Sequence, residues 1–319
     1  MNEGTGKLRY VGDGGDLFKL MIGNLLLTIV TFGIYTFWAR TKERVFHFSH
    51  TDFGGDRFAY HGTGEELFRG YLKAVAVVAV LAIAFGIVTA ATGGEDASVW
   101  VQFSLTAAFY AGLLALFVFA VNGTRRYRMS RSSWRGIRFA YDSDAVDFAT
   151  MLIKGAALSV ITLGIYTPAF QNERRAWLVS HARFGTERFA YDGPAEPLVI
   201  AFIKSLLLTI PTFGLCWTWY SAFRHRHFWS HTSVGGVRFE SSVSGMDLFS
   251  LQITNFALAI MTLGIATPWI IVRTQQFYCD RVQLAGAVDW AAIRQRADAA
   301  GATAEGIADS MDVDVGLEM

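Results

Sequence analysis

The stretch VITLGIYTPAF, residues 160–170, ends one apolar segment and begins another. Three similar stretches occur in the chain: IVTFGIYTFWA from residue 29, IPTFGLCWTWY from residue 210 and IMTLGIATPWI from residue 260. Glycine readily adopts the left-handed backbone that ends a helix, and an apolar residue commonly follows it. Each stretch is therefore predicted to end one helix and to begin the next, with the first break at residues 31–34.

The residues that make each break follow from this pattern. Thr167 and Thr267 precede prolines and are predicted to be N-caps, with the proline at the first helical position. The second helix is apolar for about a turn and a half and then carries clustered bases, which suits the lipid head-group region. The predicted helix-break residues are Gly33, Gly164, Gly214, Gly264, Pro168 and Pro268. Candidates for the aromatic belt at the membrane surface are Trp38, Trp177, Trp219 and Trp269.

Composition indicates a protein that sits in lipid. The 319 residues are 52% hydrophobic and 17% charged, with a mean hydropathy of +0.32. Soluble domains contain about 25% charged residues. Nucleic-acid binding is not predicted, because the Arg clusters adjoin apolar segments and form no separate basic domain. Cys216 and Cys279 predict neither a disulfide nor a metal site.

A second pattern recurs between the apolar segments. Arg is followed by Phe at positions 57, 138, 188 and 238, and the last two intervals are 50 residues. Each pair lies in a short alternating run beside a Gly-containing turn, which predicts a β-hairpin. Asp16, Asp147 and Asp247 lie fifteen residues before the Thr of a break and are predicted to cap helix N-termini.

These patterns predict an α-helical integral membrane protein with about five internal repeats. Its short hairpins are expected to form a small sheet outside the membrane. The predicted repeats are residues 1–62, 63–143, 144–193, 194–243 and 244–296, the last with a degenerate hairpin. Residues 297–319 contain six acids and no Lys or Arg, and are predicted to be a disordered tail.

The second unit contains two longer apolar segments, at about 70–92 and 100–123, each long enough to cross a bilayer. Five arginines follow the second segment between positions 125 and 135. The positive-inside rule then places the connecting loop outside and both ends in the cytoplasm. The four broken helices are predicted to dip into the membrane and return, which leaves all hairpins and both termini cytoplasmic. Six full spans are the alternative.

The stretches LLTIVTFGIYTFWARTKERVF (residues 26–46) and FGGDRFAYHGTGEELFRGY (residues 53–71) together resemble the YjgN-like family of bacterial inner-membrane proteins, also called domain of unknown function 898. The resemblance extends to about residue 290. It implies a multi-pass protein of the inner membrane and supplies no catalytic residues. Residues 279–290, CDRVQLAGAVDW, depart from the pattern because they lack the Arg-Phe hairpin.

Three histidines, His50, His181 and His231, occupy equivalent positions, each after a Ser. Packing of the repeats could bring the three imidazoles together as a zinc-type ligand set. The alternative is that each caps a helix end. No cofactor is predicted, because the metal has no evident supporting ligands.

Four polar residues within apolar helices are candidates for lining a cavity: Lys154, Lys204, Asn24 and Asn255. The alternative is that the lysines extend to the membrane surface and the asparagines bond across helices.

The sequence supports three general hypotheses about function. The first hypothesis is a non-enzymatic membrane protein that moves or senses a small or amphipathic solute. The alternatives are a scaffolding protein whose cytoplasmic hairpin sheet recruits a partner, and a metal-dependent membrane enzyme. The sequence contains no phosphate-binding loop and no nucleophile elbow, so nothing in it nominates an enzyme. The expected partners are the lipid bilayer and the solute, and the oligomeric state is left open.

Overall fold

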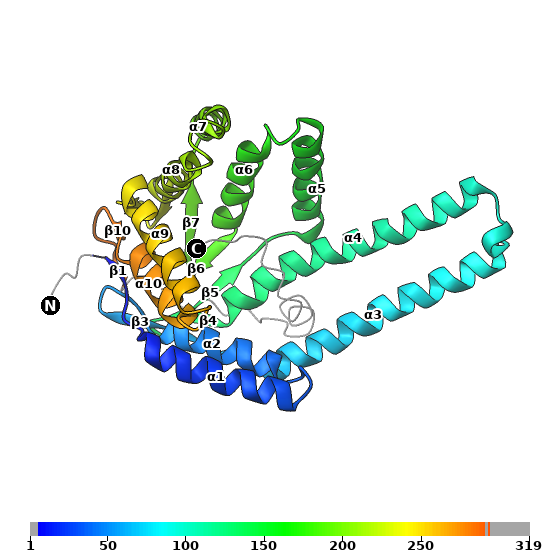
Figure 1. Ribbon diagram of the computed structural model, residues 1–319, viewed down its shortest axis with the longest axis horizontal. Helices are drawn as coiled ribbons and strands as arrows, with labels where there is room; N and C mark the ends of the chain where they lie inside the picture. The colour runs from blue at the N-terminus through cyan, green and yellow to red at the C-terminus, as the bar shows by residue number, and fades with distance from the viewer. Residues whose placement is uncertain (1–5, 291–292, 294–319) are drawn as a thin grey trace.

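A computed structural model describes residues 6–290 and residue 293, so the predicted acidic tail lies outside the described residues. In this part of the chain the order strand–helix–helix–strand occurs five times (Figure 1). The strands are β1 (Leu8–Tyr10), β2 (Thr51–Phe53), β3 (Asp56–Tyr60), β4 (Ser132–Trp134), β5 (Ile137–Tyr141), β6 (Ala182–Phe184), β7 (Glu187–Tyr191), β8 (Thr232–Val234), β9 (Val237–Ser241) and β10 (Val282–Leu284). The helices are α1 (Gly14–Val30), α2 (Thr36–Ser49), α3 (Gly64–Ala91), η1 (Gly94–Asp96), α4 (Val99–Ser130), α5 (Ala145–Ile161), α6 (Thr167–Ser180), α7 (Glu196–Leu208), α8 (Cys216–Ser230), α9 (Gly245–Met261) and α10 (Thr267–Cys279).

The predicted sheet is present, and its two ends meet. The strands pair antiparallel in chain order from β1 to β10. A bridge between Lys7 and Gln283 joins the ends, and the Leu284 N–H donates to the Gly6 carbonyl at 2.7 Å. The fifth hairpin, predicted to be degenerate, is therefore completed in space by β1. Because no later strand follows β10 in the described residues, the N-terminal strand supplies its second neighbour.

All five pairs of helices leave the sheet from one rim. Tyr10, the last residue of β1, pairs with Thr51, the first residue of β2, and Ser241 pairs with Val282 in the same way. Each such pair is joined by two helices, whereas the tight turns, such as the one at Gly54, lie at the opposite rim. Because the strands pair antiparallel in chain order, successive connections alternate between the two rims, so all five helical connections lie at the same rim. We call the end that carries the helices the helix-side rim.

The alternation predicted for the Arg-Phe strands places Phe inside the ring. In β3, Arg57 is exposed and Phe58 packs into the interior cluster. Equivalent inward residues of the even strands are Phe53, Trp134, Phe184, Val234 and Leu284. Trp290 follows β10 and fills this interior, with ring centroids 5.8 Å from Phe53 and 4.8 Å from Trp134. Aromatic residues thus form much of the core inside the sheet.

The helix starts require one correction. The three acids predicted as caps, Asp16, Asp147 and Asp247, lie in the first turn. The residues that accept the free backbone N–H groups lie three positions earlier: Asp13, Asp144 and Ser244. The first-turn acids still complement the positive end of the helix dipole.

The helices differ in length in a way that matters for a membrane. Helices α3 and α4 have 28 and 32 residues and are the two described helices long and apolar enough to cross a bilayer. The predicted span at 100–123 lies within α4, and the one at 70–92 ends one residue beyond α3. Together the two helices project far beyond the other helices (Figure 1). Helices α1, α5 and α9 have 17 residues each, about 25 Å at 1.5 Å per residue, against a hydrocarbon core of about 30 Å.

The helix break is a Schellman turn shifted by one residue from the predicted position. Leu163 takes the left-handed conformation at φ 51°, and Gly164 follows at φ 90°. The N–H of Gly164 donates to the Ser159 carbonyl at 2.7 Å, and that of Leu163 to the Val160 carbonyl at 3.0 Å. The left-handed C′ residue is therefore the Phe or Leu before each glycine, and the glycine is C″.

The Thr that opens the motif connects the two helices. Thr162 Oγ1 donates to the Leu158 carbonyl at 2.8 Å and accepts from the Tyr166 N–H at 3.0 Å. It therefore pairs one of the last carbonyls of α5 with a free N–H at the start of α6. The same two contacts are made by Thr31, Thr212 and Thr262. This double contact explains why Thr and Gly recur together.

The second helix of each break begins differently from the expectation. Tyr166 and Ala266 are the N-cap residues of α6 and α10, and neither makes a side-chain cap. Thr167 and Thr267, predicted as N-caps, are the first helical residues. The prolines after them lie within the first two helical positions and are buried, where the missing N–H removes no helical bond.

Candidate functional site

The three histidines do not form a metal site. His50, His181 and His231 are the C-cap residues of α2, α6 and α8. Each Nδ1 lies within 2.9 Å of the backbone carbonyl oxygen four residues earlier. Since a carbonyl only accepts, Nδ1 is the donor and the side chain closes the last turn. No group of three His, Cys, Asp or Glu side chains suited to a metal occurs within the described residues. The capping interpretation replaces the predicted ligand set.

The four candidate cavity residues also have other roles. Lys154 and Lys204 are exposed, so they do not line an interior space. Asn24 is buried, and its Nδ2 donates to the Ala39 carbonyl of α2 at 3.4 Å. Nδ2 of Asn255 donates to Thr274 Oγ1 of α10 at 3.1 Å. The asparagines therefore bond across helices.

An equivalent position in the second helix of every unit carries a polar residue. This position lies six residues before the C-cap residue of the helix. Its five occupants are Arg44, Arg125, Arg175, His225 and Thr274. Four of the five are arginine or histidine, although the helices come from different parts of the chain. The signal could have been found in the sequence, because the spacing to the Ser-His pair is constant in three units.

This position reaches the helix-side rim of the sheet. Nη1 of Arg44 lies 3.4 Å from the Tyr60 hydroxyl, and Nδ1 of His225 lies 2.9 Å from Ser241 Oγ. Tyr60 and Ser241 end β3 and β9 and occupy the same place in their strands. At this end of the ring of strands, hydroxyl groups therefore lie next to the aromatic core. We call the four basic residues Arg44, Arg125, Arg175 and His225, with the strand-end hydroxyls beside them, the rim cluster.

The surroundings of Arg175 contain hydroxyl groups and aromatic rings. Nη2 of Arg175 donates to Thr232 Oγ1 at 3.4 Å, and its guanidinium lies 5.4 Å from the centre of the Trp229 ring. Tyr191, which pairs with Thr232 across the strands, donates to Asn172 Oδ1 at 2.5 Å. The contacts of Arg175 are thus to a hydroxyl and to aromatic faces, and not to a carboxylate.

The cluster carries concentrated positive charge. Burial, and then the charge of neighbouring Arg125, lower the pKa of Arg175 to about 10. Burial likewise lowers the pKa of His225 to about 4, with further lowering by Arg175, Arg224 and Arg226. His225 is therefore neutral at pH 7, and its imidazole can serve as a hydrogen-bonding group beside the fixed arginine charges.

Two arginines of the cluster, Arg125 and Arg175, retain unused donors. The Nε atoms of Arg125 and Arg175 are buried and have no hydrogen-bond partner. Neither guanidinium lies within ion-pair distance of a carboxylate in the part of the chain described by the structure. Arg131, at the end of α4, differs because it pairs with Glu66 at 2.7 Å. Buried cations without a counter-ion are costly and mark candidate binding sites.

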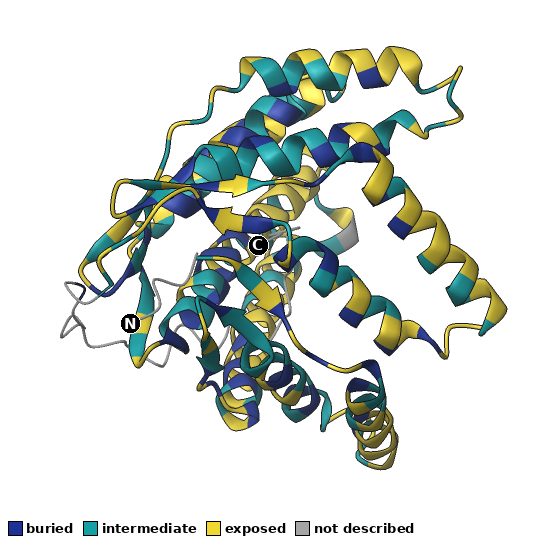
Figure 2. Cartoon of the chain, turned by 90° about the vertical axis from the view of Figure 1, so that its left-hand side faces the viewer, coloured by how far each residue is buried: buried dark blue, intermediate teal, exposed yellow. Residues whose placement is uncertain are grey.

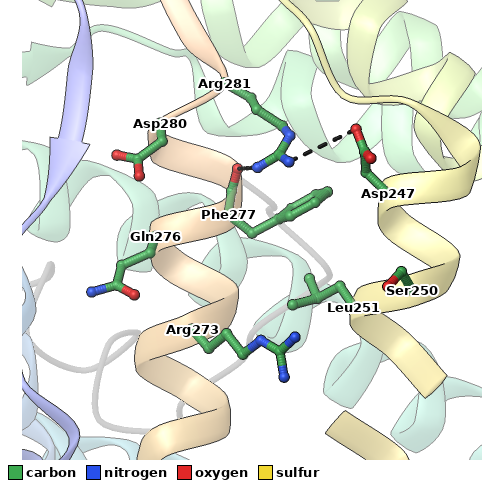
Figure 3. A pocket seen from close by; sticks show the side chains of 8 residues that line it. All are labelled: Asp247, Ser250, Leu251, Arg273, Gln276, Phe277, Asp280 and Arg281. Atoms are coloured by element: carbon green, nitrogen blue, oxygen red, sulfur yellow. Dashed lines mark hydrogen bonds and ion pairs between the residues drawn. The ribbon is translucent and has the colours of Figure 1, made fainter. Parts of the chain in front are cut away.

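A separate polar pocket of about 350 Å³ lies between α9 and α10 (Figure 3). Arg281 lies across its upper edge, 3.7 Å from the Asp247 carboxylate, and donates to the Phe277 carbonyl at 3.2 Å. Its guanidinium also lies 3.9 Å from the centre of the Phe277 ring. The charge of Arg281 is already compensated within the protein, so the rim cluster is the stronger candidate site.

Comparison with known proteins places the chain among bacterial sequences. The family described as "Bacterial protein of unknown function (DUF898)" matches residues 5–218 and 205–310. Inner membrane protein YjgN of Salmonella typhimurium (strain LT2) is 28% identical over 134 residues, 42% of this chain and 31% of that protein. Inner membrane protein YjgN of Escherichia coli O157:H7 is 26% identical over 133 residues, 42% of this chain and 30% of that protein. The matched region thus spans less than a third of each relative. No solved structure matches the chain.

Proposed function

The chain belongs to the DUF898 family of bacterial proteins, and from that premise we propose that it is a multi-pass protein of the bacterial inner membrane that binds a small or amphipathic solute for transport or sensing. The names of its relatives support the location. The rim cluster, enclosed where the helices join the sheet, supports the solute site.

The single observation that carries the membrane location is the chemistry of the four turn tips. Phe32, Leu163, Phe213 and Leu263 are 98%, 93%, 95% and 92% exposed. All four have φ near 50°, a conformation that costs a side chain such as Leu roughly 1–2 kcal/mol. In water this position favours Gly, Asn or Asp. Four large apolar side chains at such a place are expected where the surrounding solvent is lipid.

The helix lengths then define the arrangement that we propose. Helices α3 and α4 cross the bilayer, while the four shorter pairs enter it and turn back at their apolar tips. The outer faces of these helices carry many exposed residues (Figure 2), as lipid contact requires. The hydroxyl of each Thr accepts from an N–H at the start of the second helix, a backbone group that finds no water in lipid. The five strand–helix–helix–strand units are, in this proposal, copies of one module. They meet at the tight turns between paired strands, whereas the predicted repeat boundaries fall after the second strand of each hairpin.

The orientation in this proposal follows from charge. The five arginines from Arg125 to Arg135 lie at the end of α4 and in the hairpin that follows it, whereas the α3–α4 loop contains Asp96 and no Lys or Arg. The positive-inside rule places the sheet in the cytoplasm and this loop outside. Every helical pair joins the same rim, so a single orientation applies to all hairpins.

A scaffolding role for the sheet is less well supported. Partners often add a strand to an open sheet edge. In the described residues the bridge from Lys7 to Gln283 closes the ring, so neither β1 nor β10 has a free edge. A recruited protein would have to bind the outer faces of the strands instead.

Binding of a solute can be measured without knowing its identity. The full chain, purified in a mild detergent, is mixed with a bacterial extract of metabolites and lipids, washed, and denatured, and the released molecules are identified by mass spectrometry. Protein denatured before mixing is the control. We expect at least one compound to be retained stoichiometrically by the folded protein only. Retention of nothing beyond the control would contradict the solute-binding function.

A further inference from the structure

The rim cluster contains a charge arrangement that the fold itself does not explain. Arg125 and Arg175 come from α4 and α6, and each has a buried Nε without a partner. Several other arginines at the sheet pair with acids, as Arg183 does with Asp142 at 2.8 Å. A protein that needed only packing here could use neutral side chains. Like charges held together without an acid indicate that a negative group from outside the chain completes the site.

The geometry points to an oxyanion. Guanidinium groups present several donors in a planar fork that matches the oxygens of phosphate or carboxylate. The donors here come from separate helices, which suits an anion with oxygens pointing in several directions. The hydroxyl of Thr232 accepts from Arg175, and that of Tyr60 accepts from Arg44, so both hydroxyls hold guanidinium groups in place at the rim. A divalent cation is excluded by the sign of the charge.

The position of the rim cluster limits which molecules could carry the oxyanion. It lies where the second helices meet the helix-side rim, beside the strand-end residues Tyr60 and Ser241. In the proposed arrangement this level corresponds to the head-group region of the cytoplasmic leaflet. A phosphate there can belong to an anionic lipid or to a soluble phosphate compound.

We propose that Arg125 and Arg175, supported by Arg44 and His225, form a binding site for a phosphate group enclosed between the helices and the sheet. This proposal deepens the solute-binding function and rests on it. Each arginine binds the phosphate oxygens, and the neutral imidazole of His225 orients the nearby Ser241 hydroxyl. No bond is made or broken.

The test uses the full chain in a nonionic detergent and measures thermal unfolding by tryptophan fluorescence. One arm adds sodium phosphate, with sodium chloride at equal ionic strength as its control. The second arm adds phosphatidylglycerol to the micelles, with uncharged diacylglycerol as its control. We expect one arm or both to raise the Tm by several degrees, and the arm that responds identifies the source of the phosphate. No response in either arm would overturn the proposal.

The variants separate a specific site from general charge. Arg175→Gln and Arg125→Gln should each abolish the response to phosphate, and the basal Tm should stay equal or rise because repulsion is relieved. Arg188→Gln makes the same charge change on the exposed outer face of β7 and should retain the full response. Arg175→Lys keeps the charge and should retain a reduced response. A response that persists when Arg125 and Arg175 are both changed, or that is lost in Arg188→Gln, would refute the site.

Equilibrium dialysis with radiolabelled phosphate, or with radiolabelled phosphatidylglycerol in micelles, gives a readout that does not depend on stability. Stoichiometric binding to the folded wild type, with at least a tenfold weaker Kd in Arg175→Gln, is expected. If neither probe binds while the folded protein still retains another compound from the bacterial extract, the phosphate site is wrong and the solute-binding function stands. If nothing binds in either experiment, both proposals fail.

Discussion

The indole of Trp269 lies directly against Gly14, the first residue of α1. A Cβ atom on Gly14 would lie only 2.3 Å from Trp269 Cδ1 and 2.7 Å from Cγ. The contact joins the last helix to the first and so closes the ring of helices, just as Lys7 and Gln283 close the ring of strands. Trp219 makes the same contact with Gly245 at the preceding junction. These two tryptophans, which the sequence predicts to be belt residues at the membrane surface, thus pack between units.

Replacement of Gly14 by Ala should therefore destabilise the protein. The added methyl group forces the indole away, and overpacking of this kind costs about 1–3 kcal/mol. Gly23→Ala is the matched control in the same helix, because its Cβ would meet nothing within 4 Å. Helix propensity alone should stabilise Gly23→Ala by roughly 0.5–1 kcal/mol. The measurement is thermal unfolding in detergent, and equal effects of the two changes would show that the contact is not essential.

The stability of the break between α5 and α6 should depend on the hydroxyl of Thr162 and not only on the shape of its side chain. Thr162→Val keeps the branched side chain but loses both hydrogen bonds of the hydroxyl, and it leaves the Tyr166 N–H at the start of α6 without this acceptor. An unsatisfied buried donor or acceptor costs about 1–3 kcal/mol, and lipid offers no water to replace the bond. Thr162→Ser retains the hydroxyl and should be close to wild type. If Thr162→Val and Thr162→Ser accumulate equally in the membrane and unfold at the same temperature, the two hydrogen bonds of the hydroxyl do not stabilise the protein.

Labelling of single cysteines should distinguish re-entrant helices from full spans. In a background with Cys216 and Cys279 changed to Ser, a reagent that cannot cross membranes is applied to intact cells. Ser98→Cys, in the α3–α4 loop, should be labelled, whereas Glu187→Cys and Ser242→Cys should be labelled only after the membrane is opened. The reason is that all hairpins share one sheet and one side.

The turn tips provide the second half of that experiment. Leu163→Cys should stay unlabelled both in intact cells and after the membrane is opened, because the tip of the turn ends inside the hydrocarbon. Denaturation in detergent should then restore its labelling, which serves as the positive control. Labelling of Leu163→Cys from outside would mean that α5 and α6 cross the membrane, and it would favour six full spans.

Stability should fall with acid in a window set partly by His225. Its pKa is lowered from 6.5 to about 4, so between these values the unfolded chain binds the proton and the folded chain does not. The contribution of His225 is therefore complete above pH 6.5 and is lost as the pH falls toward 4, by at most about 1.4 kcal/mol per pH unit. Thermal unfolding of His225→Gln, compared with wild type from pH 4 to 7.5, should show a shallower decline. Parallel curves for the two proteins would contradict this assignment.

Local patterns in the sequence allowed much of the fold to be predicted. Four Gly breaks predicted the helical pairs, and the Arg-Phe alternation predicted hairpins with Phe facing inward. The caps were misplaced by three residues at Asp16, because an acid in the first turn and an acid at the cap give nearly the same local pattern. The candidate site was predicted poorly. Lys154 is a candidate because it lies in an apolar helix, but its side chain is on the exposed part of that helix, as is that of Ile153.

The sequence by itself determined what neighbouring residues can decide: where helices stop, which strand residues alternate, and that α3 and α4 are long enough to span a bilayer. Only the tertiary structure decided that β10 pairs with the N-terminal strand and that Arg125 and Arg175 lie close enough for their charges to interact. Backbone conformation depends on contacts a few residues apart, so it can be read along the chain. Ring closure brings residues from distant parts of the chain together, and it depends on the packing of all five units at once.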